Sequence, residues 1–141
     1  MAITSAIANS FKQEVLVEGH NLTNGADSIK LALFTSSATM GAGTTAYSSS
    51  QESSGTNYSS GGSTLTNVTP ALSGSTAVVD FADLTFSTAT VTARGCLIYN
   101  STNSNKAICA IDFGGDKTST AGDFTVVFPS ATATGAIIRL A

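Results

Sequence analysis

The sequence predicts one mainly β domain over residues 1–141, an antiparallel β-sandwich or barrel of jelly-roll type with one N-terminal α-helix. Hydrophobic residues make up 42% of the 141 residues, which is enough to bury a core. Short apolar runs recur through the second half of the chain, separated by turns rich in Gly, Ser, Thr and Asn. No repeat of fixed length can be aligned along the chain, which disfavours a propeller or a solenoid.

Residues 4–18 are the only good helix candidate. An apolar stripe follows one side of this segment at intervals of four residues: Ile3, Ile7, Phe11 and Val15. Thr4 or Ser5 is placed to cap the N-terminus, and Gly19 to end the helix in the left-handed conformation. We expect the stripe to pack on the domain's own sheet, and docking on a neighbouring subunit is the alternative.

A strand and a long polar loop follow the helix. The strand SIKLALFT carries apolar side chains on both faces, which predicts that it is covered on both sides. Residues 35–63 are mostly Ser, Thr and Gly, with Met40, Tyr47 and Tyr58 as the bulky exceptions. Loops of this length are usually functional or disordered. The loop is therefore the first candidate for a partner contact, and a mobile surface excursion is the alternative.

Residues 64–141 form the main β block. Its predicted strands are 64–69 ending at Pro70, 75–82, 84–93, 96–99, 106–113, 123–128 and 136–140. Strands 96–99 and 106–113 flank a short Asn/Ser loop and read as a β-hairpin, and residues 114–122 read as a turn. Cys96 and Cys109 lie in the two arms of this hairpin. Because each lies within an apolar run, we expect buried free thiols.

Composition and charge exclude several function classes. Charged residues are only 11% of the chain, and the six Lys and Arg do not cluster. Nucleic acids and anionic membranes need a basic patch, so we expect neither as a partner. The chain shows no signal peptide and no long apolar run, which predicts a protein that is made and at first kept soluble in the cytoplasm. A surface of hydroxyls and amides suits burial in an assembly or a quiet extracellular-type domain.

The residues carry no recognisable catalytic or metal-binding motif, and we expect no enzyme activity, cofactor or metal. His20 has no Cys or His nearby, and no GxSxG segment is present. The acids that flank the 114–122 turn do not have EF-hand spacing and read as turn residues: Asp112, Asp116 and Asp123. Arg94 and Arg139 lie in or beside apolar strands. Each is expected to be half-exposed along the sheet or paired with an acid such as Asp80 or Asp112; we favour a structural ion pair, and a pair between subunits is the alternative.

Segments spread over nearly the whole chain resemble small virion structural proteins of tailed bacteriophages. The segments are residues 9–24, 29–47, 55–67, 91–100, 106–124 and 128–141. The resemblance implies a non-enzymatic, β-rich subunit located in the virion. It implies capsid decoration, with the major capsid protein or other virion subunits as partners and a homo-oligomer, favoured as a trimer. The alternative is a tail or adhesion component that binds a host receptor or glycan.

Five bulky side chains of the helix and the loop are the candidate partner contacts. Ile7 and Phe11 belong to the predicted helix, and Met40, Tyr47 and Tyr58 belong to the predicted loop. Tyrosine combines a large contact area with a polar hydroxyl, which suits a binding surface.

Overall fold

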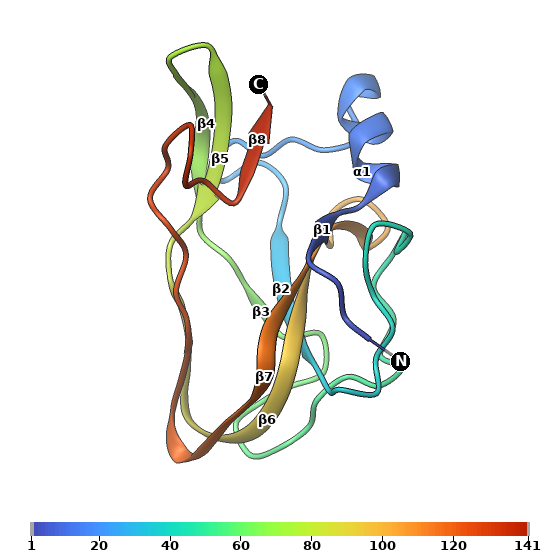
Figure 1. Cartoon of the computed structure of the whole chain (residues 1–141), viewed down its shortest axis with the longest axis vertical. Helices are drawn as coiled ribbons and strands as arrows, with labels where there is room; N and C mark the ends of the chain where they lie inside the picture. Colours follow the sequence, from blue (N-terminus) through green and yellow to red (C-terminus); the bar gives the residue numbers. More distant parts are fainter. Residues whose placement is uncertain (1, 141) are drawn as a thin grey trace.

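Two antiparallel β-sheets and one short α-helix make up the computed structural model, which describes residues 2–140 (Figure 1). The strands are β1 Ala6–Ile7, β2 Ile29–Phe34, β3 Ser63–Thr64, β4 Asn67–Ser73, β5 Thr76–Phe81, β6 Leu84–Asn100, β7 Lys106–Val126 and β8 Ile138–Leu140. The larger sheet has the order β1-β7-β6-β2-β3, and the smaller has the order β4-β5-β8. Both sheets stay open, so the mainly β class is confirmed in a sandwich-like form and not as a closed barrel.

A long hairpin of β6 and β7 is the largest element of the fold. The separate strands predicted at 84–93 and 96–99 are one strand, and β7 runs through residues 114–122, where a turn was expected. The turn prediction is wrong because these residues form β-bulges while pairing continues: the register passes from Ala93↔Lys117 to Gly95↔Asp112. Gly114, at φ 81°, supplies a conformation that such a bulge needs.

Strand β2 and the middle of the hairpin hold the core. The largest fully buried apolar side chains come from β2, β6 and β7: Ile29, Leu31, Leu33, Leu97, Ile98, Ile108 and Cys96. Of the β2 side chains only Lys30 is partly exposed, so the prediction of a strand covered on both faces is confirmed. Cys96 and Cys109 are both buried and unbonded to each other, as expected.

The N-terminal helix is shorter than predicted and begins later. Helix α1 spans Asn9–Glu14 and continues into the 3₁₀ helix η1, Val15–Val17. The residues before it pair as strand β1 with Ala110 and Cys109 of β7, so Thr4 and Ser5 are not helix caps. Ala8 occupies the cap position without a side-chain bond.

The helix end and its apolar stripe also differ in detail from the prediction. Glu18, and not Gly19, takes the left-handed conformation that ends the helix, at φ 61°. Phe11 is buried in the chain's own core, with Val15 packed against it. The stripe therefore packs on the domain's own sheet, which was the favoured interpretation.

The expected strand end at Pro70 is wrong, because Pro70 lies within a strand. Strand β4 continues to Ser73, and its register with β5 shifts between Val68 and Ala71. Because β4 is an edge strand of the smaller sheet, the missing N–H of Pro70 costs no ladder bond at this bulge.

Replacing Gly62 with alanine is expected to destabilise the fold much more than the same change at Gly74. Both glycines have positive φ, +73° and +65°, but a Cβ on Gly62 would lie 1.8 Å from the carbonyl oxygen of Leu31, whereas Gly74 faces open space. We expect Gly74→Ala to cost about 1–2 kcal/mol for the conformation alone. Gly62→Ala should cost at least about 2 kcal/mol more, through displaced backbone.

Urea unfolding of the two variants and the wild-type chain measures this difference. Equal losses at the two positions would show that the close approach of Gly62 to β2 is relaxed without cost.

Candidate interaction surfaces

The five candidate contact residues lie mostly inside the molecule. Phe11, Met40 and Tyr58 are buried, and a partner cannot reach them without moving neighbouring elements. Ile7 and Tyr47 are partly buried and pack against the core. Burial therefore removes the first three from the candidate contact surface, because the helix and the loop fold back onto the sheets.

The carboxylate of Glu52 holds the long loop together. Tyr47 Oη and Ser60 Oγ donate to Oε1 at 2.5 and 3.0 Å. Tyr58 Oη and the Gly61 N–H donate to Oε2 at 2.7 and 2.8 Å. Four donors thus converge on one carboxylate, and charge-assisted bonds of this kind are stronger than neutral ones.

The same tyrosines join the loop to the larger sheet. Tyr58 Oη accepts the backbone N–H of Leu33 in β2 at 2.8 Å. The ring of Tyr47 stacks on that of Tyr99 in β6, with centroids 4.6 Å apart, and Tyr99 Oη donates to the Gly61 carbonyl at 2.7 Å. The loop is therefore packed against the body, and its tyrosines anchor it there.

Burial raises the pKa of two of these phenols. Burial, followed by the hydrogen bond to Glu52, raises the pKa of Tyr58 far above its ordinary value of 10. Burial, with the nearby Tyr47 and Glu52, raises the pKa of Tyr99 to about 12. Protonated phenols are the donors that the Glu52 carboxylate requires. The sequence singled out the two loop tyrosines but missed Glu52, the acid that lies five and six residues from them.

The single histidine, His20, is held by hydrogen bonds to side chains of the chain itself. Nε2 of buried His20 lies 2.9 Å from Glu14 Oε1, and Nδ1 lies 3.0 Å from Asn100 Nδ2. The backbone N–H groups of Thr102 and Asn103 donate to Asn100 Oδ1 and fix the orientation of this amide. His20 therefore accepts at Nδ1 and donates at Nε2, as a neutral imidazole does. This network links α1 to the β6–β7 turn.

The charged side chains of the strands have different partners from those expected. Arg94 Nε lies 2.9 Å from Asp116 Oδ1, not beside Asp80 or Asp112, and both side chains are partly exposed. Arg139 donates to the carbonyls of residues 133 and 134. An exposed ion pair such as Arg94–Asp116 contributes little stability.

Within residues 2–140 no three acidic, His or Cys side chains gather where they could hold a metal ion.

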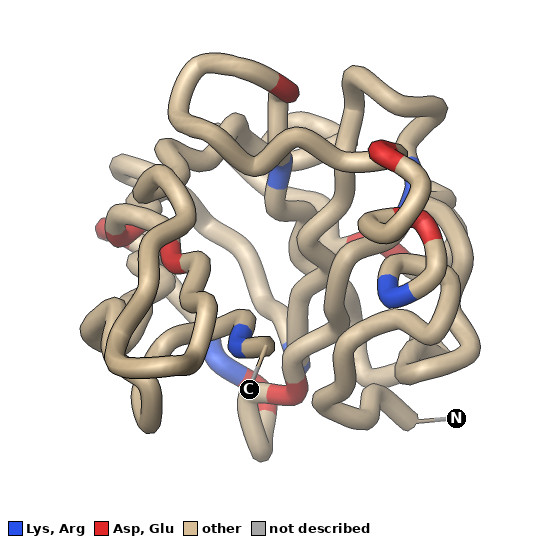
Figure 2. Tube along the Cα trace, turned by 90° about the horizontal axis from the view of Figure 1, so that it is seen from above, with Lys and Arg blue, Asp and Glu red and all other residues tan. Residues whose placement is uncertain are grey.

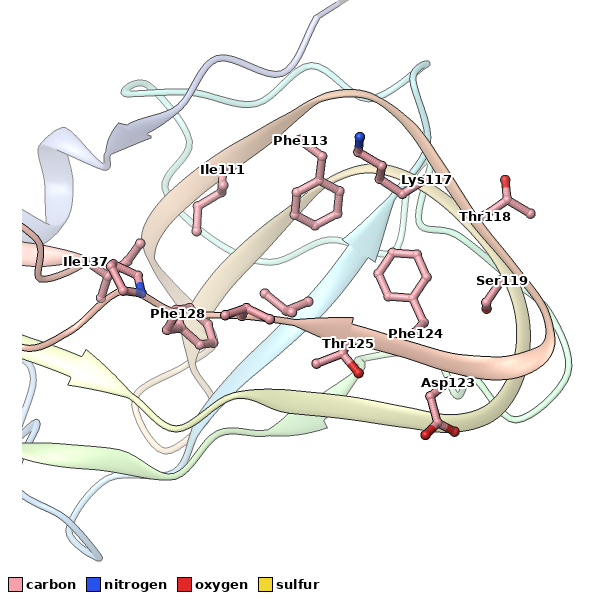
Figure 3. Close-up of a pocket in the computed structure, with 13 residues that line it drawn as sticks. Ile111, Phe113, Lys117, Thr118, Ser119, Asp123, Phe124, Thr125, Phe128 and Ile137 are labelled. Atoms are coloured by element: carbon pink, nitrogen blue, oxygen red, sulfur yellow. The ribbon is translucent and has the colours of Figure 1, made fainter.

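An apolar cavity of about 570 Å³ lies on the concave side of β7 (Figure 3). The bend in β7 brings Phe113 and Phe124 toward one another, with ring centroids 6.3 Å apart. Lys117 and Asp123 are exposed at its rim. Beside this cavity β7 has β6 as its only strand partner among the described residues, because β1 pairs only with residues 109–110. The cavity is thus bordered by a free strand edge.

Few positions on the Cα trace are charged (Figure 2). Lys117 pairs through the backbone with Ala93, next to Arg94, and Arg94 is paired with Asp116. Over residues 2–140, no helix has both the length and the apolar character needed to cross a membrane.

Removing the hydroxyl of Tyr58 is expected to destabilise the chain. Tyr58→Phe leaves the Leu33 N–H without its acceptor and takes one donor from Glu52, and such losses cost about 1–3 kcal/mol in buried sites. The raised pKa also predicts a pH effect: the folded state holds this phenolic proton more tightly than the unfolded chain. Its stabilisation is complete below about pH 10 and is lost as the pH rises further.

Urea unfolding at neutral pH and at alkaline pH tests both statements. The wild-type chain should lose more stability than Tyr58→Phe above about pH 10. Identical alkaline losses in the two proteins would contradict the role given to this phenol.

Replacing Asp80 with asparagine is expected to stabilise the chain at neutral pH. Asp80 is buried in β5; the Phe81 N–H donates to Oδ1, while Oδ2 lacks a partner. Burial raises the pKa of this carboxyl, so the folded state loses stability as the pH rises through the carboxyl range. Asp80→Asn removes that loss. Its gain should be present at about pH 7 and absent below about pH 3 in urea unfolding; a gain of equal size at both would refute the ionisation argument.

Comparisons with known proteins do not indicate a function for this chain. The chain matches no protein-family model, no curated protein and no solved structure. The surfaces described above and the resemblance noted in the sequence are therefore the basis for a functional proposal.

Proposed function

We propose that this protein is a non-enzymatic structural subunit of a tailed-phage particle that decorates and stabilises the capsid. The observation that carries the proposal is the character of its surface. Large apolar side chains are exposed on it: Leu16, Val17, Val68, Leu72, Val127 and Leu140. In a chain with 11% charged residues, this surface suits burial against other proteins.

Exposed threonines of the β6–β7 hairpin support the same function. Thr85 and Thr125 pair through their hydroxyls at 3.0 Å, and Thr92 and Thr118 do so at 2.9 Å. Hydroxyls that satisfy each other lose little when a second surface covers them, whereas charged side chains would have to be desolvated. A threonine-rich sheet face is therefore suited to close contact with a shell.

The surroundings of two acids, Glu52 and Asp80, favour a structural role for them over a catalytic one. Both oxygens of Glu52 are occupied by two donors each, which holds the loop and leaves no free lone pair aimed at a substrate. Asp80 is buried in β5 and cannot meet a substrate from solvent. Neither residue has the paired, accessible arrangement that acid–base hydrolysis requires.

The resemblance to small virion proteins supports the setting. Within such a particle, the major capsid protein offers the extended, repeated surface that a decorating subunit needs. Decoration requires binding to the assembled shell, which distinguishes it from attachment to a tail or to a host receptor.

Co-sedimentation of the purified chain with capsids of the phage that encodes it tests the proposal. We expect saturable binding to assembled capsids, little binding to free capsid subunits, and a higher temperature of capsid disruption when the chain is bound. Bovine serum albumin in the same gradients controls for trapping. Binding only to tails or to host cells would overturn capsid decoration and favour the tail or adhesion function.

A further inference from the structure

A second cavity, of about 560 Å³, lies between the helix and the smaller sheet. We name it the helix–sheet groove. Its principal apolar walls are Phe11, Val15, Ala77, Val79, Ile138 and Leu140. Figure 1 shows α1 and the smaller sheet at the same end of the molecule. The groove therefore lies at that end.

Exposed apolar side chains gather around this groove. Of the six large hydrophobic residues exposed within residues 2–140, Leu140 (54% exposed) lines the groove. Three more lie next to lining residues in the chain or across a strand pair: Leu16 (83% exposed), Val17 (71%) and Leu72 (75%). Leu16 and Val17 belong to η1, which lies beside the groove residues Val15 and Glu18. Patches of this kind, when contiguous, mark interaction sites.

The strand register places the two leucines of the smaller sheet in one row. Leu72 pairs with Ala77, and Ala77 pairs with Leu140, so the three side chains point to the same face. The next pair on this face, Val79 and Ile138, is buried. The apolar face of the sheet thus extends beyond the part that the chain itself covers.

Charges of opposite sign flank the exposed residues Leu16 and Val17 along the helical segment. Lys12 and Leu16 are four residues apart and share one side of the helical segment, and Glu18 lies at its other end. Lys12 and Glu18 are both exposed. The third charge of the segment, Glu14, is turned inward to His20 and Lys106. Two such segments placed antiparallel would set each Lys12 opposite the other copy's Glu18.

We propose that a second copy of this chain fills the helix–sheet groove around a two-fold axis. Leu16 and Val17 of each copy enter the partner's groove, and the ion pairs Lys12–Glu18 form on either side of the axis. The same patch then serves both copies, as a two-fold contact requires. This contact is the surface through which the proposed capsid subunit would self-associate. It rests on the proposed function only for its biological setting.

The patch is small for a protein–protein interface. The four side chains expose on the order of 500 Å² in each copy, so a dimer would bury about 1,000 Å² in all, at the lower limit for specific interfaces. An interface of this size fits a weak dimer whose population rises with protein concentration. The resemblance implies a trimer instead, and the measured mass separates the two.

Sedimentation equilibrium of the purified full chain over a range of concentrations tests the proposal. Val17→Glu should weaken the dimer at least about tenfold, because it places a charge in the groove. Val127→Glu is the matched control: Val127 is also 71% exposed but lines the cavity beside β7, away from the helix–sheet groove, and this change should leave the dimer intact. Equal effects of the two substitutions would overturn the assignment of the surface.

Charge reversal tests the two-fold geometry. Lys12→Glu and Glu18→Lys should each weaken the dimer about threefold to tenfold, and the double variant should recover to within about twofold of the wild-type value. Absence of recovery would overturn the antiparallel arrangement. A wild-type chain that stays monomeric, or forms only trimers, would overturn the proposal. Circular dichroism of each variant shows that a lost dimer is not a lost fold.

The capsid assay distinguishes the two proposals. If Val17→Glu is monomeric but still binds capsids, both the contact and the capsid function stand. If the wild-type chain dimerises through the groove without binding capsids, only the capsid function fails.

Discussion

Continuous pairing between β6 and β7 is the constraint on which the rest of the structure depends. This hairpin positions β1 on its outer edge and β2 on its inner edge, so the larger sheet is built around it. Its bulges bend β7 until Phe113 and Phe124 face each other, which forms the cavity on its concave side. A hairpin without those bulges would be straighter, and its far end would not curve toward the C-terminal segment.

The long polar loop becomes part of the body because one carboxylate organises it. Glu52 binds Tyr47 and Tyr58, and these tyrosines contact β6 and β2. A Ser/Thr/Gly segment has little apolar surface of its own to oppose the entropy of ordering it. Its aromatic rings supply that surface, and the carboxylate directs them inward. This division of roles explains why the bulky loop residues serve the chain's own stability rather than a partner.

The sequence predicts the class of fold well and the contact surface poorly. Alternation and apolar runs correctly locate β2, β5, β8 and most of the long hairpin, since burial follows side-chain pattern directly. The same reasoning misplaces a turn at 114–122, because Gly, Asp and Thr serve bulges as readily as turns. It begins the helix too early, because pairing of Ala6–Ile7 with β7 outweighs local helix propensity. The exposed row of Leu72 and Leu140 depends on strand order, which no local pattern contains.

The two buried cysteine thiols react poorly with oxidants. Burial raises the pKa of the Cys109 thiol to about 12, and that of Cys96 well above its ordinary value. Oxidants react with the thiolate, and almost none of it exists in such a core. Both thiols are therefore protected from oxidation in a reducing cell and in air alike.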